Sequence, residues 1–126
     1  MGIEAVGSSR AEVLEAMARG VATLTFGGIP ATGQIKAKIL VEGNDDVELL
    51  VNWLNEVVYL CEKKQMVPAA FHVESIDHGK LRANMDGELF DPRKHGVERQ
   101  IKSVTYHQAC CEATREGWYA RVYVDL

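Results

Sequence analysis

The sequence predicts an α+β domain with two layers, a mostly antiparallel sheet with two helices on one face. Two segments begin with a capping-box spacing and continue with an apolar period near 3.6 residues, which is typical of helices. Most other segments alternate apolar and polar residues with a period of two, which is typical of half-buried strands. After residue 68 the strands follow one another through turns, which indicates an antiparallel meander.

The first helix is expected from about residue 9 to residue 25. Ser9 and Glu12 have the capping-box spacing at its start. The apolar residues that follow lie on one side of a helix: Val13, Leu14, Met17, Val21 and Leu24. Gly27, Gly28 and Pro30 are expected to end it.

A half-buried strand is expected over Gln34 to Glu42, and a second helix over Val47 to Cys61. This helix follows the capping-box pair Asp45 and Glu48 and is apolar almost all round, so it should be the central one. Its polar residues form one narrow stripe, which is either an exposed edge or a buried polar seam: Glu48, Asn52, Asn55 and Glu56.

The rest of the chain is predicted to form strands. Period-two segments lie near 71–74 and 81–85, with a hairpin turn at Asp77-His78-Gly79 between them. A loop over 91–96 leads to a long strand at about 101–113. The chain then turns at 114–117, and the last strand places Trp118, Ala120, Val122 and Val124 on one face, with Tyr119, Arg121, Tyr123 and Asp125 on the other.

Length and composition fit one globular domain spanning residues 1–126, with 47% hydrophobic and 25% charged residues. The 14 Lys and Arg against 18 Asp and Glu give a net charge of -4, which disfavours strong direct binding of RNA. A protein partner, a metal ion or a basic enzyme surface is the better expectation.

The sequence has no secretory leader pattern and no apolar run of about 20 residues, so a cytoplasmic location without a membrane partner is expected. The odd number of cysteines agrees with free thiols in a reducing compartment: Cys61, Cys110 and Cys111. The four histidines lack zinc-site spacing, and no Walker loop or nucleophile motif is present. The sequence therefore predicts no independent catalytic site.

Two features could nevertheless carry chemistry. Asp125 places its carboxylate beside the α-carboxylate of Leu126, and hard divalent ions bind such oxygen pairs. A solvated chain end is the alternative, which spacing alone favours. Lys102 stands between Ile101 and Val104, which look buried. Its ammonium group is either a snorkelling surface charge or a point charge aimed at a phosphate or carboxylate.

Three motifs, in the same order and spacing, resemble the archease family over nearly the whole chain. The first is the helix Val47–Glu56. The second is Gly87-Glu88 followed by Asp91, His95 and the run Ile101–His107. The third is the ending Gly117–Leu126, with its terminal acidic residue.

The resemblance implies a two-layer α+β archease fold and an accessory role, not an enzyme. Archeases activate the GTP-dependent RtcB-type RNA ligase of tRNA splicing, speeding its guanylylation and allowing multiple turnover. The alternative that the resemblance allows is a chaperone of RNA-modifying enzymes such as tRNA methyltransferases. A metal-dependent hydrolase is a third hypothesis, disfavoured because no nucleophile and base are visible.

The resemblance also assigns site residues. The family's divalent-metal site, for calcium or magnesium, carries over onto Asp125 and the carboxylate of Leu126, and Lys102 and Asp125 are implied in ligase activation. The family's Asp-His-Thr-Ala-Asp motif supplies further ligands, but here Met1 stands where it should end. A downstream start, a shortened chain or loss of the site would each account for this. Two carboxylates leave most of a cation's coordination sphere to water, so weak metal binding is expected.

Overall fold

The computed structural model describes residues 1–28 and 31–126. In this described part the elements are, in chain order, β1 (Gly2–Gly7), α1 (Arg10–Phe26), β2 (Ile35–Glu42), α2 (Asp46–Glu62), β3 (Met66–Asp77), β4 (Lys80–Leu89), β5 (Ser103–Thr114) and β6 (Gly117–Asp125). All paired strands are antiparallel. The α+β class is therefore confirmed.

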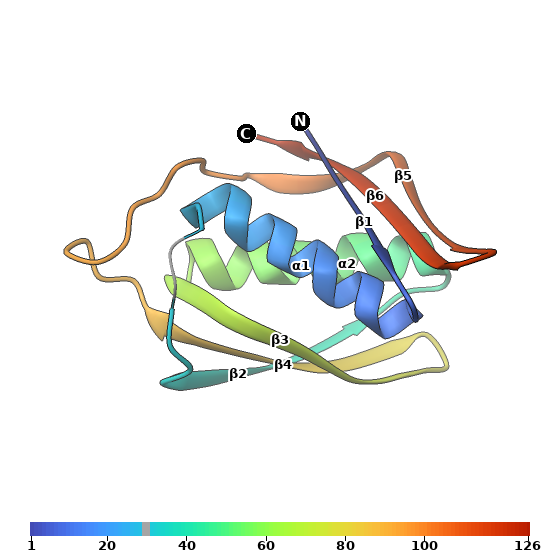
Figure 1. The fold of residues 1–126 in the computed structure, drawn as a ribbon, viewed down its shortest axis with the longest axis horizontal. Helices are drawn as coiled ribbons and strands as arrows, with labels where there is room; N and C mark the ends of the chain where they lie inside the picture. Colours follow the sequence, from blue (N-terminus) through green and yellow to red (C-terminus); the bar gives the residue numbers. More distant parts are fainter. Residues whose placement is uncertain (29–30) are drawn as a thin grey trace.

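The layers differ from the expectation of one sheet with both helices on one face. The strands form two three-stranded sheets, with the orders β1-β6-β5 and β2-β4-β3. We call the first the terminal sheet and the second the hairpin sheet. Both helices lie between the two sheets, which makes three layers (Figure 1). The physical reason is that α2 is apolar almost all round, so a sheet on one side alone would leave apolar surface in water.

Helix α1 starts and ends through local backbone geometry. The Ser9 hydroxyl oxygen accepts a hydrogen bond from the Glu12 backbone N–H at 3.1 Å, which confirms the predicted N-cap. The Glu12 carboxylate accepts from the Ser8 hydroxyl at 2.6 Å. Gly27 ends the helix with a φ of 75°, a conformation that glycine adopts without a Cβ penalty. The predicted break at Pro30 lies outside the described residues.

Helix α2 is the central element, as predicted. The Asp45 carboxylate accepts from the Glu48 backbone N–H at 2.8 Å and caps its first turn. Trp53 and Leu54 are completely buried between the sheets. The Trp53 indole N–H donates to the carbonyl of Leu14 at 2.9 Å, which joins the two helices and satisfies a buried donor.

The polar stripe of α2 is a seam that touches both sheets. The side-chain amide of Asn55 pairs with both backbone groups of Val104 in β5: its Nδ2 donates to the carbonyl at 3.1 Å, and its Oδ1 accepts from the N–H at 2.8 Å. Asn52 donates to the carbonyl of Glu42, the last residue of β2, at 2.7 Å. The seam thus satisfies strand-edge backbone groups that would otherwise need water.

The predicted hairpin turn is confirmed between β3 and β4. His78 and Gly79 both have positive φ angles, 52° and 73°, as a two-residue type I′ turn requires. A Cβ on Gly79 would stand 2.5 Å from the carbonyl oxygen of Gly43, so this position also needs glycine for close approach. The turn therefore ties the hairpin to the end of β2.

The long strand predicted from Ile101 begins instead at Ser103 and is interrupted. Its register against β6 shifts between Thr105 and Cys110. Within the shift, Gln108 has a φ of 55°, and the Arg121 guanidinium donates twice to its carbonyl, at 3.1 and 3.2 Å. A bulge of this kind bends a strand and ends its regular pairing locally.

In the described part of the chain, neither helix is long and apolar enough to cross a membrane.

Candidate functional site at the paired chain ends

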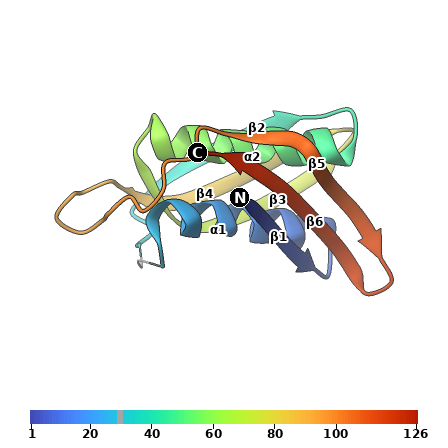
Figure 2. The same cartoon turned by 90° about the horizontal axis from the view of Figure 1, so that it is seen from above.

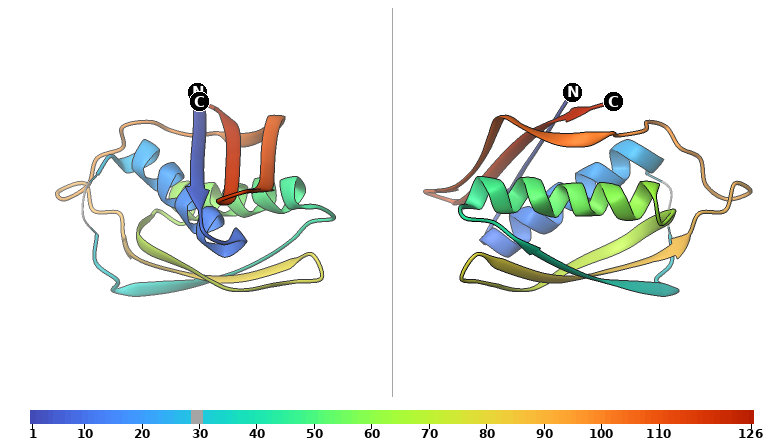
Figure 3. Two further views of the ribbon diagram at one scale, coloured as in Figure 1. Left: turned by 45° about the vertical axis from the view of Figure 1, so that its right-hand side comes forward. Right: turned by 180° about the vertical axis from the view of Figure 1, so that it is seen from behind.

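Three segments meet at one end of the terminal sheet. The Val124 N–H donates to the carbonyl of Met1 at 2.9 Å, and the Lys102 N–H donates to the carbonyl of Asp125 at 2.8 Å. The two chain ends lie side by side, next to the start of β5 (Figures 2 and 3). The fold therefore brings Lys102, Asp125 and Leu126 together, although sequence spacing did not indicate this.

The side chains at this end point into solvent. Lys102 is exposed, whereas its neighbours Ile101 and Val104 are buried, as the sequence predicted. Asp125 is also exposed, and Leu126 is 47% exposed. Within residues 1–28 and 31–126, the ammonium group of Lys102 joins none of the ion pairs. Its charge is thus available to a partner.

The backbone holds Lys102 from two sides. On one edge its N–H bonds the carbonyl of Asp125, and on the other edge Asn55 pairs with Val104, two residues further along. A side chain whose backbone is fixed in this way loses less entropy when it contacts a partner. Asn55 thus helps to hold the backbone near Lys102, although in the sequence it was only one member of a polar stripe. Its spacing from Asn52 on an apolar helix was the available signal.

The predicted metal ligands, Asp125 and the Leu126 α-carboxylate, are two adjacent carboxylates at the C-terminus. The Asp125 side chain and the Leu126 α-carboxylate are neighbours, but no group of three His, Cys, Asp or Glu residues in the described chain could hold a metal ion. Calcium takes six to eight oxygen ligands and magnesium six. Among the described residues, the donors do not form a complete cage for either ion.

The register of β1 shows where further donors would have to stand. Gly2 pairs with Tyr123, and the Met1 carbonyl accepts from Val124. In an antiparallel ladder, a residue placed before Met1 would therefore lie opposite Asp125. Acidic residues attached there would reach the same exposed end as Asp125 and Leu126.

Thr32, Glu88 and His95 form a second polar cluster, in which Glu88 of β4 and His95 of the following loop are buried and Thr32 is exposed. Nε2 of His95 lies 2.5 Å from Oε1 of Glu88, and Nδ1 accepts from the Asp91 backbone N–H at 2.9 Å. Oε2 of Glu88 accepts from the backbone N–H and the hydroxyl of Thr32, at 3.0 and 2.8 Å. The cluster therefore fastens the loop after β4 to the segment before β2.

This cluster has the composition of a catalytic dyad but not the geometry. Both ring nitrogens of His95 are occupied, and its side chain is 1% exposed, so no substrate proton can reach it. The Nδ1 contact leaves the ring proton on Nε2, facing Glu88. The hydrogen bonds from Thr32, together with that from His95, lower the pKa of Glu88 to about 2. In the sequence, Glu88 and His95 stood out only as members of the second motif that resembles the archease family.

The cluster predicts acid sensitivity. Because the pKa of Glu88 falls from its ordinary 4.5 to about 2 on folding, its carboxylate stabilises the fold fully above about pH 4.5, and this contribution is lost as the pH falls towards 2. Glu88→Gln should remove that part of the pH dependence. Urea unfolding at several pH values between about 5 and 3 measures it.

The control for this prediction is Glu116→Gln at an exposed position. Its free energy of unfolding should depend on pH as that of the wild type does. If the free energy of unfolding of Glu88→Gln depends on pH as strongly as that of the wild type, the Glu88 cluster is not the source of the acid sensitivity.

Cys61 and Cys111 supply no nucleophile at this site. Cys61, Cys110 and Cys111 are free, as predicted. Burial raises the pKa of Cys61 and of Cys111 to about 12. Both are therefore protonated thiols at neutral pH, which neither attack substrates nor bind metals readily.

The fold and the site together define a class: a small α+β domain with two helices between two antiparallel sheets, whose paired chain ends lie beside the exposed Lys102. The sequence matches the Archease protein family over residues 1–126, and the chain belongs to this family.

Curated relatives and solved structures agree. The chain is 35% identical to the protein archease of Methanosarcina mazei, covering 97% of this chain and 86% of that protein. It is 32% identical to the protein archease of Pyrococcus furiosus, covering 100% of this chain and 92% of that protein.

Two solved structures share the fold. The solution structure of Methanobacterium thermoautotrophicum protein 1598 superposes with a TM-score of 0.75 at 24% identity, covering 99% of this chain and 91% of that one. An archease from Thermotoga maritima, described as a possible chaperone, superposes with a TM-score of 0.65 at 17% identity, covering 100% and 90%.

Proposed function

We propose that this chain is an accessory protein, not an enzyme, that activates a GTP-dependent RtcB-type RNA ligase in cytoplasmic tRNA splicing. Membership of the archease family supports the proposal. The observation that carries it is the hydrogen bond between the Lys102 N–H and the Asp125 carbonyl, which brings two exposed charges of opposite sign to one end of the terminal sheet. Activation here means faster loading of guanylate and repeated turnover.

The chemistry of this end suits a protein partner. A lysine ammonium group is a compact point charge that can bind a phosphate or a carboxylate. The carboxylates of Asp125 and Leu126 can bind a cation or a basic surface of the ligase. The overall charge of -4 opposes a broad grip on the RNA itself.

Ligase turnover tests the proposal. Purified RtcB-type ligase, GTP and a cleaved tRNA substrate are assayed alone and with this chain at about one-tenth of the ligase concentration. Two forms are tested: the 126-residue chain, and the same chain extended by Asp-His-Thr-Ala-Asp before Met1. More ligated product per ligase molecule supports the activator. Absence of acceleration by both forms contradicts it.

The second candidate is a chaperone of RNA-modifying enzymes such as a tRNA methyltransferase. Its support is the description of the Thermotoga maritima archease as a possible chaperone. Light scattering of a heated methyltransferase, with and without this chain, separates the two functions. Suppressed aggregation without any gain in ligase turnover would favour the chaperone.

We further propose that Asp125 and the α-carboxylate of Leu126 contribute to a calcium or magnesium site that the extension completes. The 126-residue chain without the extension should bind either ion weakly, because two carboxylates leave most ligand positions to water. The extended chain should bind more tightly, and its melting temperature should rise with metal concentration. Calorimetric titration measures both affinities.

Two changes to the extended chain serve as tests of that site. Asp125→Asn removes one charge, and residues added after Leu126 convert its α-carboxylate into an amide. Each should erase the metal-dependent rise in melting temperature. If either form binds the ion as tightly as the extended chain, the paired chain ends are not the metal site.

A further inference from the structure

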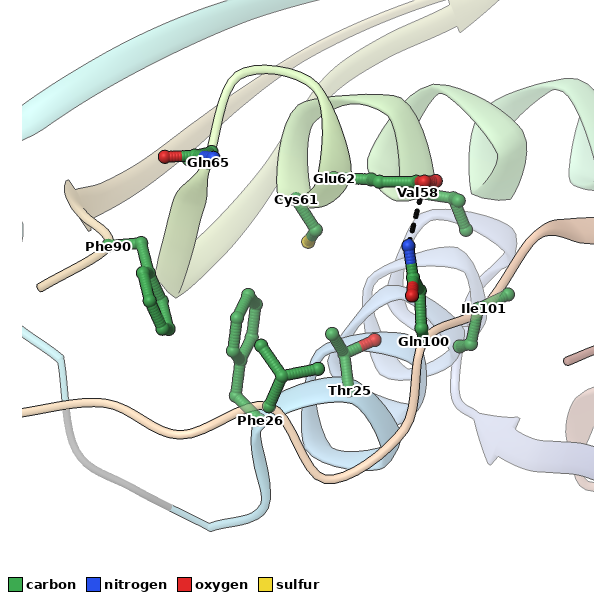
Figure 4. Close-up of a pocket in the computed structure, with 10 residues that line it drawn as sticks. Thr25, Phe26, Val58, Cys61, Glu62, Gln65, Phe90, Gln100 and Ile101 are labelled. Carbon is green, nitrogen blue, oxygen red and sulfur yellow. Dashed lines mark hydrogen bonds between the residues drawn. The ribbon is translucent and has the colours of Figure 1, made fainter. Parts of the chain in front are cut away.

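A cavity of about 280 Å³ opens at the end of the domain where both helices finish. Phe26 comes from α1, Val58 and Cys61 from α2, and Phe90, Val97 and Ile101 from the loop between β4 and β5 (Figure 4). Its wall is largely apolar. Val97 is 54% exposed, although it is a large hydrophobic residue, so part of this apolar lining faces solvent.

Hydrogen bonds hold the cavity wall in place. The Glu98 N–H donates to the carbonyl of Thr25 at 2.8 Å, and the Phe90 N–H donates to the carbonyl of Gln65 at 2.7 Å. Across the rim, the Gln100 side chain donates to the Glu62 carboxylate at 3.2 Å (Figure 4). The loop is thus fastened to the ends of both helices, which makes the hollow a preformed feature.

The charges around the cavity differ from those of the whole chain. Segments 62–65 and 91–102 hold six of the 14 Lys and Arg residues but three of the 18 Asp and Glu residues. Lys63, Lys64, Arg99 and Lys102 adjoin lining residues and are exposed. In the described part of the chain none of these four forms an ion pair, whereas Arg10, Lys36 and Lys80 elsewhere each do. The chain segments that form the rim of this apolar hollow therefore carry an excess of positive charge in an otherwise acidic protein, although Glu62 at the rim is itself acidic.

From these observations we infer that the cavity docks an acidic peptide segment of a partner protein through one large apolar side chain. The volume lies below the roughly 300–1,000 Å³ of typical small-molecule pockets, and it suits a single anchoring side chain. Apolar anchors in desolvated pockets carry much of the energy of protein interfaces. Carboxylates on either side of the anchor would complement the unpaired lysines.

The occupant is a peptide and not RNA because bases stack on exposed aromatic rings, whereas Phe26 is only 4% exposed and packs against Phe90, with ring centroids 6.3 Å apart. Burial keeps Cys61 a neutral thiol, and the other inward residues are mainly aliphatic or aromatic. The inference goes beyond ligase activation and stands without it, because it rests on the cavity and its rim alone. Residues 97–101 run directly into Lys102, so a segment docked here would lie beside the paired chain ends.

Nuclear magnetic resonance titration tests the inference. The probe is a capped nine-residue peptide of alternating Asp and Glu with a central Trp, added to the isotope-labelled chain. Shifts should concentrate in residues 25–27, 58–65 and 97–101. Replacing Trp by Ser in the peptide should weaken binding by about tenfold or more, as removal of an anchor does.

Variants of the chain sharpen the test. Lys63→Ala with Lys64→Ala should weaken binding by about threefold or more, since exposed ion pairs contribute modestly. Val97→Ser, a partly exposed position, should weaken it while leaving the melting temperature nearly unchanged. The matched control Lys38→Ala with Arg82→Ala removes the same charge from the hairpin sheet and should leave binding unchanged.

Several outcomes would overturn the inference. They are the absence of shifts, shifts confined to another surface, equal binding of the Ser peptide, and equal binding by the Lys63 and Lys64 variant. An eight-nucleotide uridine RNA that shifts the same residues more strongly than the peptide would reassign the surface to nucleic acid.

Discussion

Leu54→Ala is expected to lower the free energy of unfolding by about 2 to 5 kcal/mol, the usual range for a buried leucine. Leu54 is completely buried in α2, which lies between the two sheets (Figure 1). Truncation would leave a void that neither sheet can close without distorting the other. Urea unfolding followed by circular dichroism measures the change.

The matched control is Leu40→Ala, because Leu40 is 60% exposed on the outer face of the hairpin sheet. This change should cost less than about 1 kcal/mol. A loss below about 0.5 kcal/mol for Leu54→Ala, as is typical of surface positions, would show that α2 is not the central helix.

Local patterns were sufficient to predict the helices. The capping spacings at Ser9 and Asp45 predicted both N-termini, because a cap is formed by residues three apart in sequence. The alternation in β2 and the turn at His78-Gly79 were predictable for the same reason, since they depend on neighbouring residues.

The division into two sheets depends on long-range pairing. Period-two alternation indicates that a strand has one buried face but not which strand lies beside it. The N-terminal strand β1 pairs with the last strand β6, across nearly the whole chain. The sequence indicated only that α2 is apolar almost all round, which favours packing against it from two sides. The bulge around Gln108 likewise rests on Arg121 of the next strand.

The candidate site was predicted in part. Resemblance to the archease family singled out Lys102 and Asp125, whereas spacing alone left each between a functional and a solvated interpretation. The structure shows their backbones hydrogen bonded to one another. The support from Asn55 and the clasp of Thr32 on Glu88 could not be predicted, because each joins residues about 50 positions apart.

Lys102→Ala in the extended chain tests whether the paired chain ends carry the function. Loss of a hydrogen bond to a charged group costs about 1.5 to 3 kcal/mol of interaction free energy. The increase in ligase turnover that the extended chain causes should therefore fall about tenfold or more. The melting temperature should hardly change, because the side chain is exposed. Lys38→Ala, an exposed lysine of the hairpin sheet, is the matched control.

Ligase turnover with the three proteins, compared at equal concentration, decides the matter. We expect full activation by the unmodified extended chain and by Lys38→Ala, and little activation by Lys102→Ala. Equal activation by all three proteins would show that Lys102 is an ordinary surface lysine and that its charge does not contribute to activation.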